Sequence, residues 1–147
     1  MPATSEAIEL AVAAAAAADD KKALDPLILE VADVLAVVDL FLIVSASNER
    51  QLAAIVDAIE ERLAGMGRRV LRREGTPESG WVLLDLGDLV CHVMTVAERA
   101  HYELERLWGD VATRDVLTGA PAPPLGRRAA VPAGAEVAAA DGPDTGA

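Results

Sequence analysis

The chain has 147 residues, a formal net charge of −11 at pH 7 and an isoelectric point near 4.5. This length fits one domain with a single core. The acidity argues against direct DNA binding, because phosphate backbones are bound by clustered Lys and Arg, and it favours a basic protein partner.

Cysteine content and the first residues bear on the compartment. Cys91 is the single cysteine, which excludes an internal disulfide and fits a reducing compartment. Glu6 and Glu9 accompany the first apolar residues with no basic stretch before them, unlike a secretory signal. The alanine-rich run 11–18 is shorter than the roughly 20 apolar residues of a membrane span. We therefore expect a cytoplasmic protein without a membrane segment.

The first half of the chain predicts a helix, two strands and a second helix. Residues 6–18 are alanine-rich and favour a short helix. Residues 27–34 and 40–44 are rich in branched apolar side chains, as strands are, and the second run lacks alternation, which indicates a strand covered on both faces. Ser47 or Asn48 can cap the next helix, which Gly65 ends. Its apolar stripe recurs at steps of three and four: Leu52, Ile55, Val56, Ile59 and Leu63.

The second half predicts three more strands and a last helix. Residues 69–73, 81–84 and 89–96 have strand patterns, and the last two should form a hairpin across the turn at 85–88. Thr95 and Glu98 form a capping box for a helix over residues 97–108. The order α-β-β-α-β-β-β-α predicts an α/β domain with a mixed sheet of about five strands and flanking helices.

The end of the chain differs in composition from the rest. Residues 119–147 hold five of the eight prolines and five of the eleven glycines, with alanine at most other positions. Such a segment lacks the apolar side chains that build a core. We therefore expect the domain to cover residues 1–118 and residues 119–147 to form a disordered tail.

No pattern of an enzyme or a metal site stands out. A catalytic triad would combine a serine, a histidine and an acid from five residues: Ser45, Ser47, His92, Asp85 and Asp88. Neither serine lies in the Gly-x-Ser-x-Gly sequence of a nucleophile elbow, so the triad is not supported. Cys91 and His92 are neighbours in a strand, so they point to opposite faces and cannot both face one ion. Gly-rich phosphate loops are absent from the sequence. We predict no catalytic residue, no metal and no cofactor.

Three features admit two interpretations each. Trp81 follows a polar loop, where its ring either caps the core or stands exposed as a partner's anchor. His92 shares a strand face with Val90 and Met94, which favours a hydrogen-bonded, partly buried histidine over a surface binding role. One basic cluster consists of Arg68, Arg69, Arg72 and Arg73. We interpret it as a charged strand that resists edge-to-edge pairing, and an RNA contact is the alternative.

A series of short motifs runs through the chain in this order: Asp39-x-Phe-x-Ile-x-Ser45, Ser47 with Arg50-Gln51, Ala54-Ile55, Ala58-Ile59, Glu74-Gly75, Trp81-Val-Leu-Leu-Asp85-x-Gly87-Asp88, His92, Arg99, Tyr102 and Leu104-Glu105-x-Leu107-Trp108. Over residues from about 18 to 111 this series resembles the ribosomal silencing factor family, also called RsfS or Iojap-like. The resemblance implies a fold of nucleotidyltransferase-like topology without the catalytic carboxylates.

The resemblance also implies a function by occlusion. Members of that family bind ribosomal protein uL14 on the large ribosomal subunit, block association with the small subunit and repress translation under nutrient limitation. Carried onto this chain, the partner-binding residues would be Glu74, Trp81, Asp85, Leu86, Asp88, His92 and Tyr102. Leu40 and Leu86 stand where the family often has an aromatic ring, and Cys91 replaces a common valine. The resemblance further implies a homodimer.

Two other hypotheses stay open at this point. One is a nucleotidyltransferase-like enzyme, in which the carboxylates of Asp85 and Asp88 would hold Mg²⁺ beside Ser45 and Ser47, although the turn spacing disfavours it. The other is an oligomeric scaffold with no ribosomal role.

Overall fold

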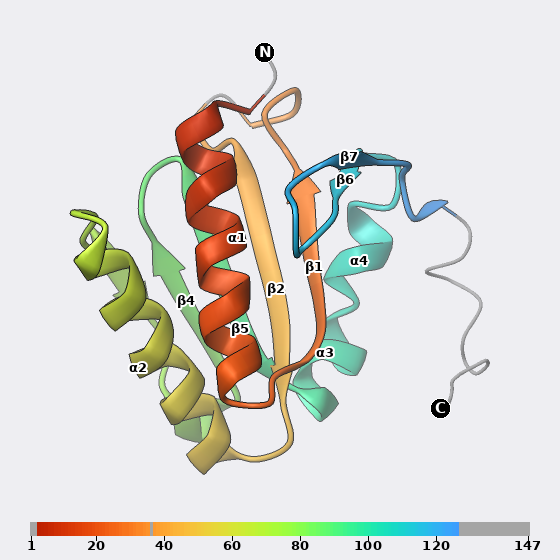
Figure 1. The fold of residues 1–147 in the computed structure, drawn as a ribbon. Coiled ribbons are helices and arrows are strands. Elements are labelled where there is room, and N and C mark those ends of the chain that lie inside the picture. The colour runs from red at the N-terminus through yellow and green to blue at the C-terminus, as the bar shows by residue number, and fades with distance from the viewer. Residues whose placement is uncertain (1–2, 36, 127–147) are drawn as a thin grey trace.

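A computed structural model describes residues 3–35 and 37–126, which form a mixed sheet with helices on both faces (Figure 1). The elements are α1 Ser5–Asp20, β1 Leu24–Glu30, β2 Leu40–Ala46, α2 Glu49–Gly65, β3 Arg72–Glu74, the 3-10 turn η1 Pro77–Ser79, β4 Trp81–Asp85, β5 Leu89–Thr95, α3 Val96–Tyr102, α4 Leu104–Leu107, β6 Thr113–Arg114 and β7 Pro121–Ala122. Seven strands lie in the order β3-β4-β5-β2-β1-β6-β7. The α/β class is confirmed, with two short strands more than the five or so predicted.

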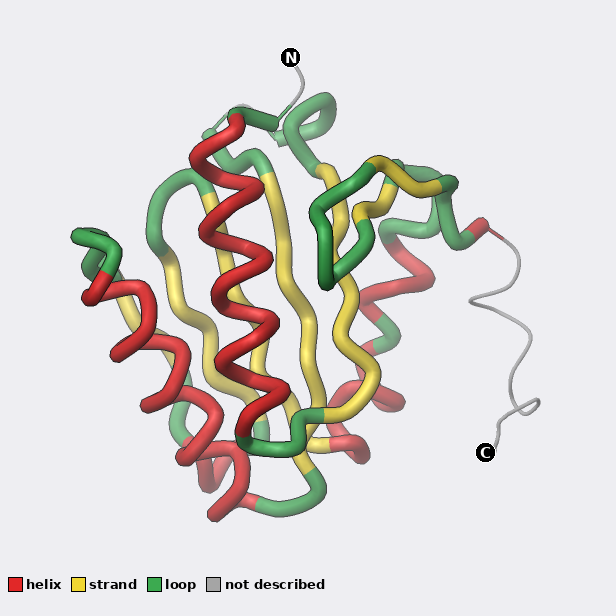
Figure 2. Tube along the Cα trace, viewed as in Figure 1, coloured by secondary structure: helices red, strands yellow, loops and turns green. Residues whose placement is uncertain are grey.

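The sheet divides the core into two clusters. Helices α1 and α2 cover one face, and α3 and α4 lie against the other (Figure 2). Strand β2 is buried along almost its whole length, as its lack of alternation predicts. It pairs in parallel with β5 over seven residue pairs, from Leu40 opposite Leu89 to Ala46 opposite Thr95. The predicted hairpin of β4 and β5 is also confirmed, with Leu83 opposite His92.

The predicted second helix is confirmed together with its cap. The Asn48 side chain accepts the backbone N–H of Gln51 at 2.8 Å, and the Gln51 Oε1 atom accepts the N–H of Ser47 at 2.6 Å. Gln51 Nε2 also donates to the carbonyls of Lys21 and Lys22, so the helix start fastens the connection between α1 and β1. All five residues of the predicted apolar stripe are buried.

The first predicted strand is shifted in the structure. It covers Leu24–Glu30 rather than residues 27–34, because its partner β2 begins at Leu40 opposite Glu30, and beyond that pair only the Val31 N–H bonds to the Asp39 carbonyl, at 2.9 Å. The chain then turns, and Val31 accepts the backbone N–H of Leu35 at 2.8 Å. Strand β3 is also shorter than predicted and begins only at Arg72. For both β1 and β3, the stretch of sequence with a strand pattern is longer than the stretch that pairs with the neighbouring strand.

The predicted helix over residues 97–108 is two helices. Thr95 caps α3 by accepting the N–H of Glu98 at 3.2 Å, as predicted, but the helix ends at Tyr102. Glu103 adopts a left-handed conformation with φ of +50°, and α4 continues in a new direction. The break lets Leu104 and Trp108 pack against the second core cluster.

Ordered structure extends past the predicted domain end at residue 118. Strand β6 pairs with β1 and with β7, and β7 lies inside the segment predicted as a disordered tail. Gly119 approaches Ile8 of α1 so closely that a Cβ atom there would overlap the isoleucine side chain. The tail prediction is therefore wrong for this β7 stretch, and its remainder, residues 127–147, lies outside the described residues. In residues 3–35 and 37–126, no helix is long and apolar enough to cross a membrane.

Candidate partner-binding site

Strand alternation sorts the predicted site residues between the two faces of the sheet. Trp81 packs with the cluster under α3 and α4, while Val82 and Leu84 belong to the cluster under α1 and α2. Glu74 is paired with Leu83 across β3 and β4, which puts it on the same face as Trp81. The structure therefore gathers Glu74, Trp81 and Tyr102 on one face, with His92 beneath them.

These side chains line a shallow pocket of about 360 Å³, which we call the Trp81 pocket. Its lining comes from β3, the following loop, β4 and α3: Glu74, Gly75, Ser79, Trp81, Leu83, Glu98 and Tyr102. The rings of Trp81 and Tyr102 lie with their centroids 4.8 Å apart, and Tyr102 is 51% exposed. Two carboxylates accompany the two rings, and no Lys or Arg is among the lining residues. The pocket thus suits an apolar or positively charged group.

The loop before β4 sets the position of Trp81. At Gly75, with φ of +85°, a Cβ atom would overlap the carbonyl oxygen of Trp81, so only glycine lets the loop approach the strand this closely. Thr76 and Ser79 form a reciprocal capping box around η1, and the Ser79 hydroxyl donates to the carbonyl of Thr76 at 2.7 Å. The loop is a defined turn, and it delivers the indole to a fixed place at the strand start.

Helix α3 is held over the sheet by Arg99. The Arg99 Nε atom donates to Glu105 at 2.7 Å, and Nη1 donates to the Asp25 carbonyl at 2.6 Å and to the Ser45 hydroxyl at 3.0 Å. The side chain is 11% exposed. Because α3 carries both Tyr102 and Glu98, these bonds also hold one wall of the Trp81 pocket.

His92 does not reach the surface. Its side chain is 5% exposed, and its Nδ1 atom accepts the indole N–H of Trp81 at 3.2 Å. Burial lowers the pKa of His92 to about 4, so the imidazole is neutral at neutral pH. The expectation of a hydrogen-bonded histidine is confirmed, and His92 is more deeply buried than the partly buried side chain predicted. His92 can therefore act on a partner only through Trp81. Trp81 is half-buried: it packs against the second core cluster and also lines the Trp81 pocket, so the ring is neither fully buried nor fully exposed.

Leu86 was predicted on the binding face, and the structure corrects this. Its side chain is 2% exposed and belongs to the cluster under α1 and α2. Leu86 lies an odd number of residues after Trp81, so strand alternation directs its side chain to the other face of the sheet, toward α1 and α2. It cannot offer contact area to a partner.

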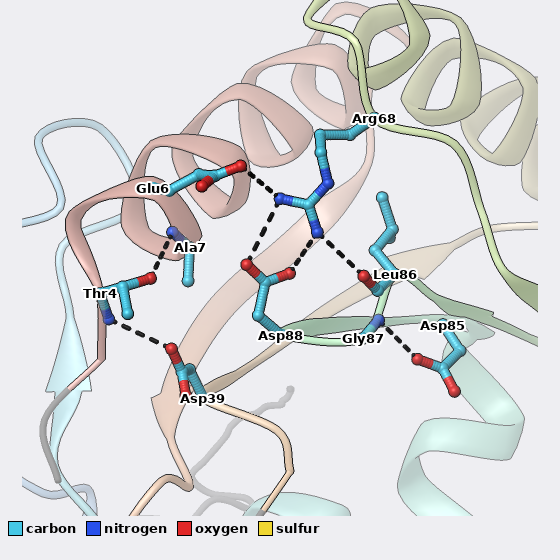
Figure 3. A network of polar contacts seen from close by, with 9 residues as sticks. All are labelled: Thr4, Glu6, Ala7, Asp39, Arg68, Asp85, Leu86, Gly87 and Asp88. Atoms are coloured by element: carbon cyan, nitrogen blue, oxygen red, sulfur yellow. Dashed lines mark hydrogen bonds and ion pairs between the residues drawn. The ribbon is translucent and has the colours of Figure 1, made fainter.

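Asp85 is the last residue of β4, at its far end from Trp81, and Asp88 lies in the turn to β5. Asp85 Oδ1 accepts the N–H of Gly87 at 2.8 Å, and Arg68 Nη2 donates to Asp88 Oδ1 at 2.7 Å (Figure 3). Arg68 also donates to the Leu86 carbonyl at 3.0 Å and to Glu6 of α1 at 2.7 Å. Asp88 therefore fastens the hairpin turn to α1 and to the loop after α2.

Three members of the predicted basic cluster are engaged with acids. Arg68 pairs with Asp88 and Glu6, Arg73 lies 3.5 Å from Glu60, and Arg72 lies 3.0 Å from Glu74. This arrangement favours the interpretation as a charged edge strand over an RNA contact.

Sequence reasoning missed four lining residues: Gly75, Ser79, Leu83 and Glu98. Leu83 is two residues after Trp81 in β4, so strand alternation predicts that both side chains lie on the same face of the sheet. The sequence indicates Glu98 only as the partner of Thr95 in the helix cap, and its place in the same pocket lining as Glu74 follows from the packing of α3 on the sheet. Nothing in its sequence neighbourhood indicates that proximity.

The residues of the enzyme hypothesis are not brought together. Ser45 is buried at the carboxyl end of β2, whereas Asp88 adjoins the opposite end, where its carbonyl accepts the N–H of Leu40 at 3.1 Å. The two ends are roughly 20 Å apart at the rise of a strand. Within the part of the chain that the structure describes, no group of three or more His, Cys, Asp or Glu residues could hold a metal ion.

Known proteins resemble this chain over most of its length. Residues 4–141 match the family described as "Ribosomal silencing factor during starvation". The ribosomal silencing factor RsfS of Bacillus subtilis is 44% identical over 106 residues, which are 72% of this chain and 90% of that protein. The chloroplastic protein Iojap of Zea mays is 31% identical over 109 residues, 72% of this chain and 46% of that protein.

Solved structures agree with the fold. A crystal structure of a Chromobacterium violaceum protein superposes with a TM-score of 0.66 at 31% identity, over 69% of this chain and 84% of the other. One of a Bacillus halodurans protein does so with a TM-score of 0.61 at 38% identity, over 71% of this chain and 95% of the other.

Proposed function

The chain belongs to the ribosomal silencing factor family, and on that premise we propose that it binds ribosomal protein uL14 on the large ribosomal subunit and blocks association with the small subunit. The outcome is repression of translation under nutrient limitation. The regulated step needs no bond to be made or broken, so no catalytic group is assigned.

The observation that supports this proposal is the Trp81 pocket. It combines two partly exposed rings with the carboxylates of Glu74 and Glu98 in a chain of net charge −11. Proteins that hold ribosomal RNA are basic, because they neutralise phosphates with Lys and Arg. An acidic surface with an aromatic centre is complementary to such a protein in charge, and its rings supply the desolvated anchor that most interfaces use.

Occlusion follows from size. A folded domain of this length is about 35 Å across by the usual scaling of compact chains. Bound where the two subunits must touch, a body of that width keeps their surfaces apart, and steric exclusion requires no cofactor. We further propose that the protein acts in the cytoplasm, where ribosomal subunits meet.

The proposal is tested with separated ribosomal subunits on sucrose gradients. Adding the protein should reduce the fraction of joined ribosomes, and the protein should sediment with the large subunit and not with the small one. Large subunits lacking uL14 serve as the control and should neither retain the protein nor respond to it. Undiminished joining at saturating protein would refute the blocking mechanism, and retention on uL14-deficient subunits would refute the assigned partner.

We also propose that the free protein is a homodimer. Several large apolar side chains are exposed in the described residues, among them Leu71, Leu107 and Val37, and a second copy can cover such side chains. Light scattering at micromolar concentration should give twice the monomer mass of 15.3 kDa. The monomer mass would contradict the dimer.

A further inference from the structure

We propose that His92 is a positioning residue of the partner site: it holds the indole of Trp81 from beneath by accepting its N–H, and so determines which side of the ring faces the Trp81 pocket. The use of the ring by a partner rests on the proposed function above. The way the ring is held is a property of the free protein and can be tested without a ribosome.

The geometry places the two side chains for this role. Leu83 is paired with His92 and Trp81 with Met94 across β4 and β5, so Trp81 and His92 are diagonal neighbours on one face of the sheet. The indole nitrogen lies 3.2 Å from His92 Nδ1, and the ring planes are tilted by 46°. An indole at a strand start can turn about two side-chain torsions, and this bond selects one orientation.

His92 is itself fixed from behind by a row of rings. Phe41 of β2 meets His92 edge to face with centroids 4.8 Å apart, and Trp108 meets Phe41 in the same way at 5.3 Å. On the outer side, Trp81 contacts Tyr102. The aromatic row, Trp108-Phe41-His92-Trp81-Tyr102, therefore runs from the core cluster to the exposed pocket wall. A shift of the imidazole would disturb packing in the core, so the acceptor stays in place.

Stability alone does not explain a histidine at this position. Because Nδ1 accepts the indole N–H, the imidazole proton lies on Nε2, and Nε2 is buried with no hydrogen-bond partner in the part of the protein that the structure describes. A buried donor without an acceptor is costly, and an apolar side chain of similar shape would avoid that cost. What the histidine supplies, and an apolar residue does not, is the acceptor for Trp81.

One consequence concerns how the ring meets a partner. Since the indole N–H is already bonded inside the protein, Trp81 has no free donor for the interface. It offers its ring face and its carbon edge, which bind apolar groups and cations. The adjacent carboxylates of Glu74 and Glu98 then supply the charged contacts.

The test uses two variants of the same shape at one site, His92→Asn and His92→Leu. Asn keeps an acceptor close to the Nδ1 position, and Leu matches Asn in branching without one. Exchange of the Trp81 indole proton is followed by ¹H–¹⁵N NMR, with its signal assigned through Trp108→Phe. Binding to isolated large subunits is measured on the same preparations, and urea unfolding reports stability.

The expected result separates positioning from stability. The indole proton should exchange slowly in the unmodified protein and in His92→Asn, and markedly faster in His92→Leu. Large-subunit affinity should be weaker in the Leu variant than in the Asn variant by about three- to tenfold, the range of one neutral hydrogen bond. Unfolding should rank them the other way, with Leu at least as stable as Asn, so lost stability cannot account for lost binding.

Two results would overturn the proposal. Equal indole exchange in the Leu and Asn variants would show that His92 does not hold the ring. Changed exchange with equal affinity would show that the orientation is not used by the partner. Failure of the proposed function looks different, because the unmodified protein would then neither sediment with large subunits nor block their joining, while the exchange difference between the His92 variants persists.

Discussion

Replacing Trp81 by alanine tests whether the Trp81 pocket is the partner site. The ring is half-buried: it packs against the second core cluster, and in the pocket its centroid lies 4.8 Å from that of Tyr102. Truncating an aromatic anchor at the centre of an interface commonly costs about 2 kcal/mol or more, which is about thirtyfold in affinity. We expect at least that loss of large-subunit binding and a matching loss of the block on subunit association.

The same substitution also weakens the fold, and the structure bounds by how much. A fully buried tryptophan costs about 3 to 5 kcal/mol when truncated. Trp81 is only partly enclosed, so we expect about half of that, near 2 kcal/mol, including the loss of its bond to His92. A protein with ordinary stability stays folded after such a change.

Leu104→Ala is the matched control. Leu104 is also half-buried and packs against the same core cluster, but it neither lines the Trp81 pocket nor belongs to the aromatic row. It should lose similar stability by urea denaturation while keeping large-subunit affinity within about twofold per folded molecule. The reasoning is refuted by a folded Trp81→Ala protein that still blocks subunit joining, or by equal loss of binding in both variants.

Three further predictions concern charge and stability. Large-subunit affinity should fall as salt is raised from low to physiological concentration, since ions screen an acidic site against a basic partner; an affinity independent of salt in a sedimentation assay would contradict the assigned complementarity. The pKa of His92 is lowered from 6.5 to about 4 in the folded protein, so below pH 6.5 the unfolded chain binds a proton that the folded protein does not, and stability falls as the pH falls. His92 should contribute a loss of about 2 kcal/mol between pH 7 and pH 5, measured as the difference from His92→Leu in urea unfolding. Arg68→Ala should destabilise the fold by about 2 kcal/mol, because Asp88 and the Leu86 carbonyl lose a charged donor, while large-subunit binding of the folded protein stays unchanged; weakened binding without loss of stability would return Asp88 to the partner site.

Local patterns along the chain determine much of the fold. The stripe of α2 recurs within each helical turn, and its cap involves residues three positions apart, so neighbours along the chain decide both. The hairpin of β4 and β5 needs only a tight turn between two apolar runs. Glu74, Trp81 and Tyr102 of the Trp81 pocket were assigned to one site only through the resemblance of the motif series to the ribosomal silencing factor family, and no local pattern groups them.

The remaining features depend on which segments meet. Periodicity continues the last helix through Glu103, but packing on the second core cluster turns the chain there. Leu86 and Asp88 lie close to Trp81 in sequence, but neither lines the Trp81 pocket. Strand alternation places Leu86 on the opposite face of the sheet, and Arg68 binds Asp88 in the hairpin turn. The bond between Trp81 and His92 joins residues on two strands, and it requires the register that pairs Leu83 with His92. The register of two strands depends on the assembled sheet, because it is set by which face of each strand becomes buried. No single segment of the sequence therefore determines it.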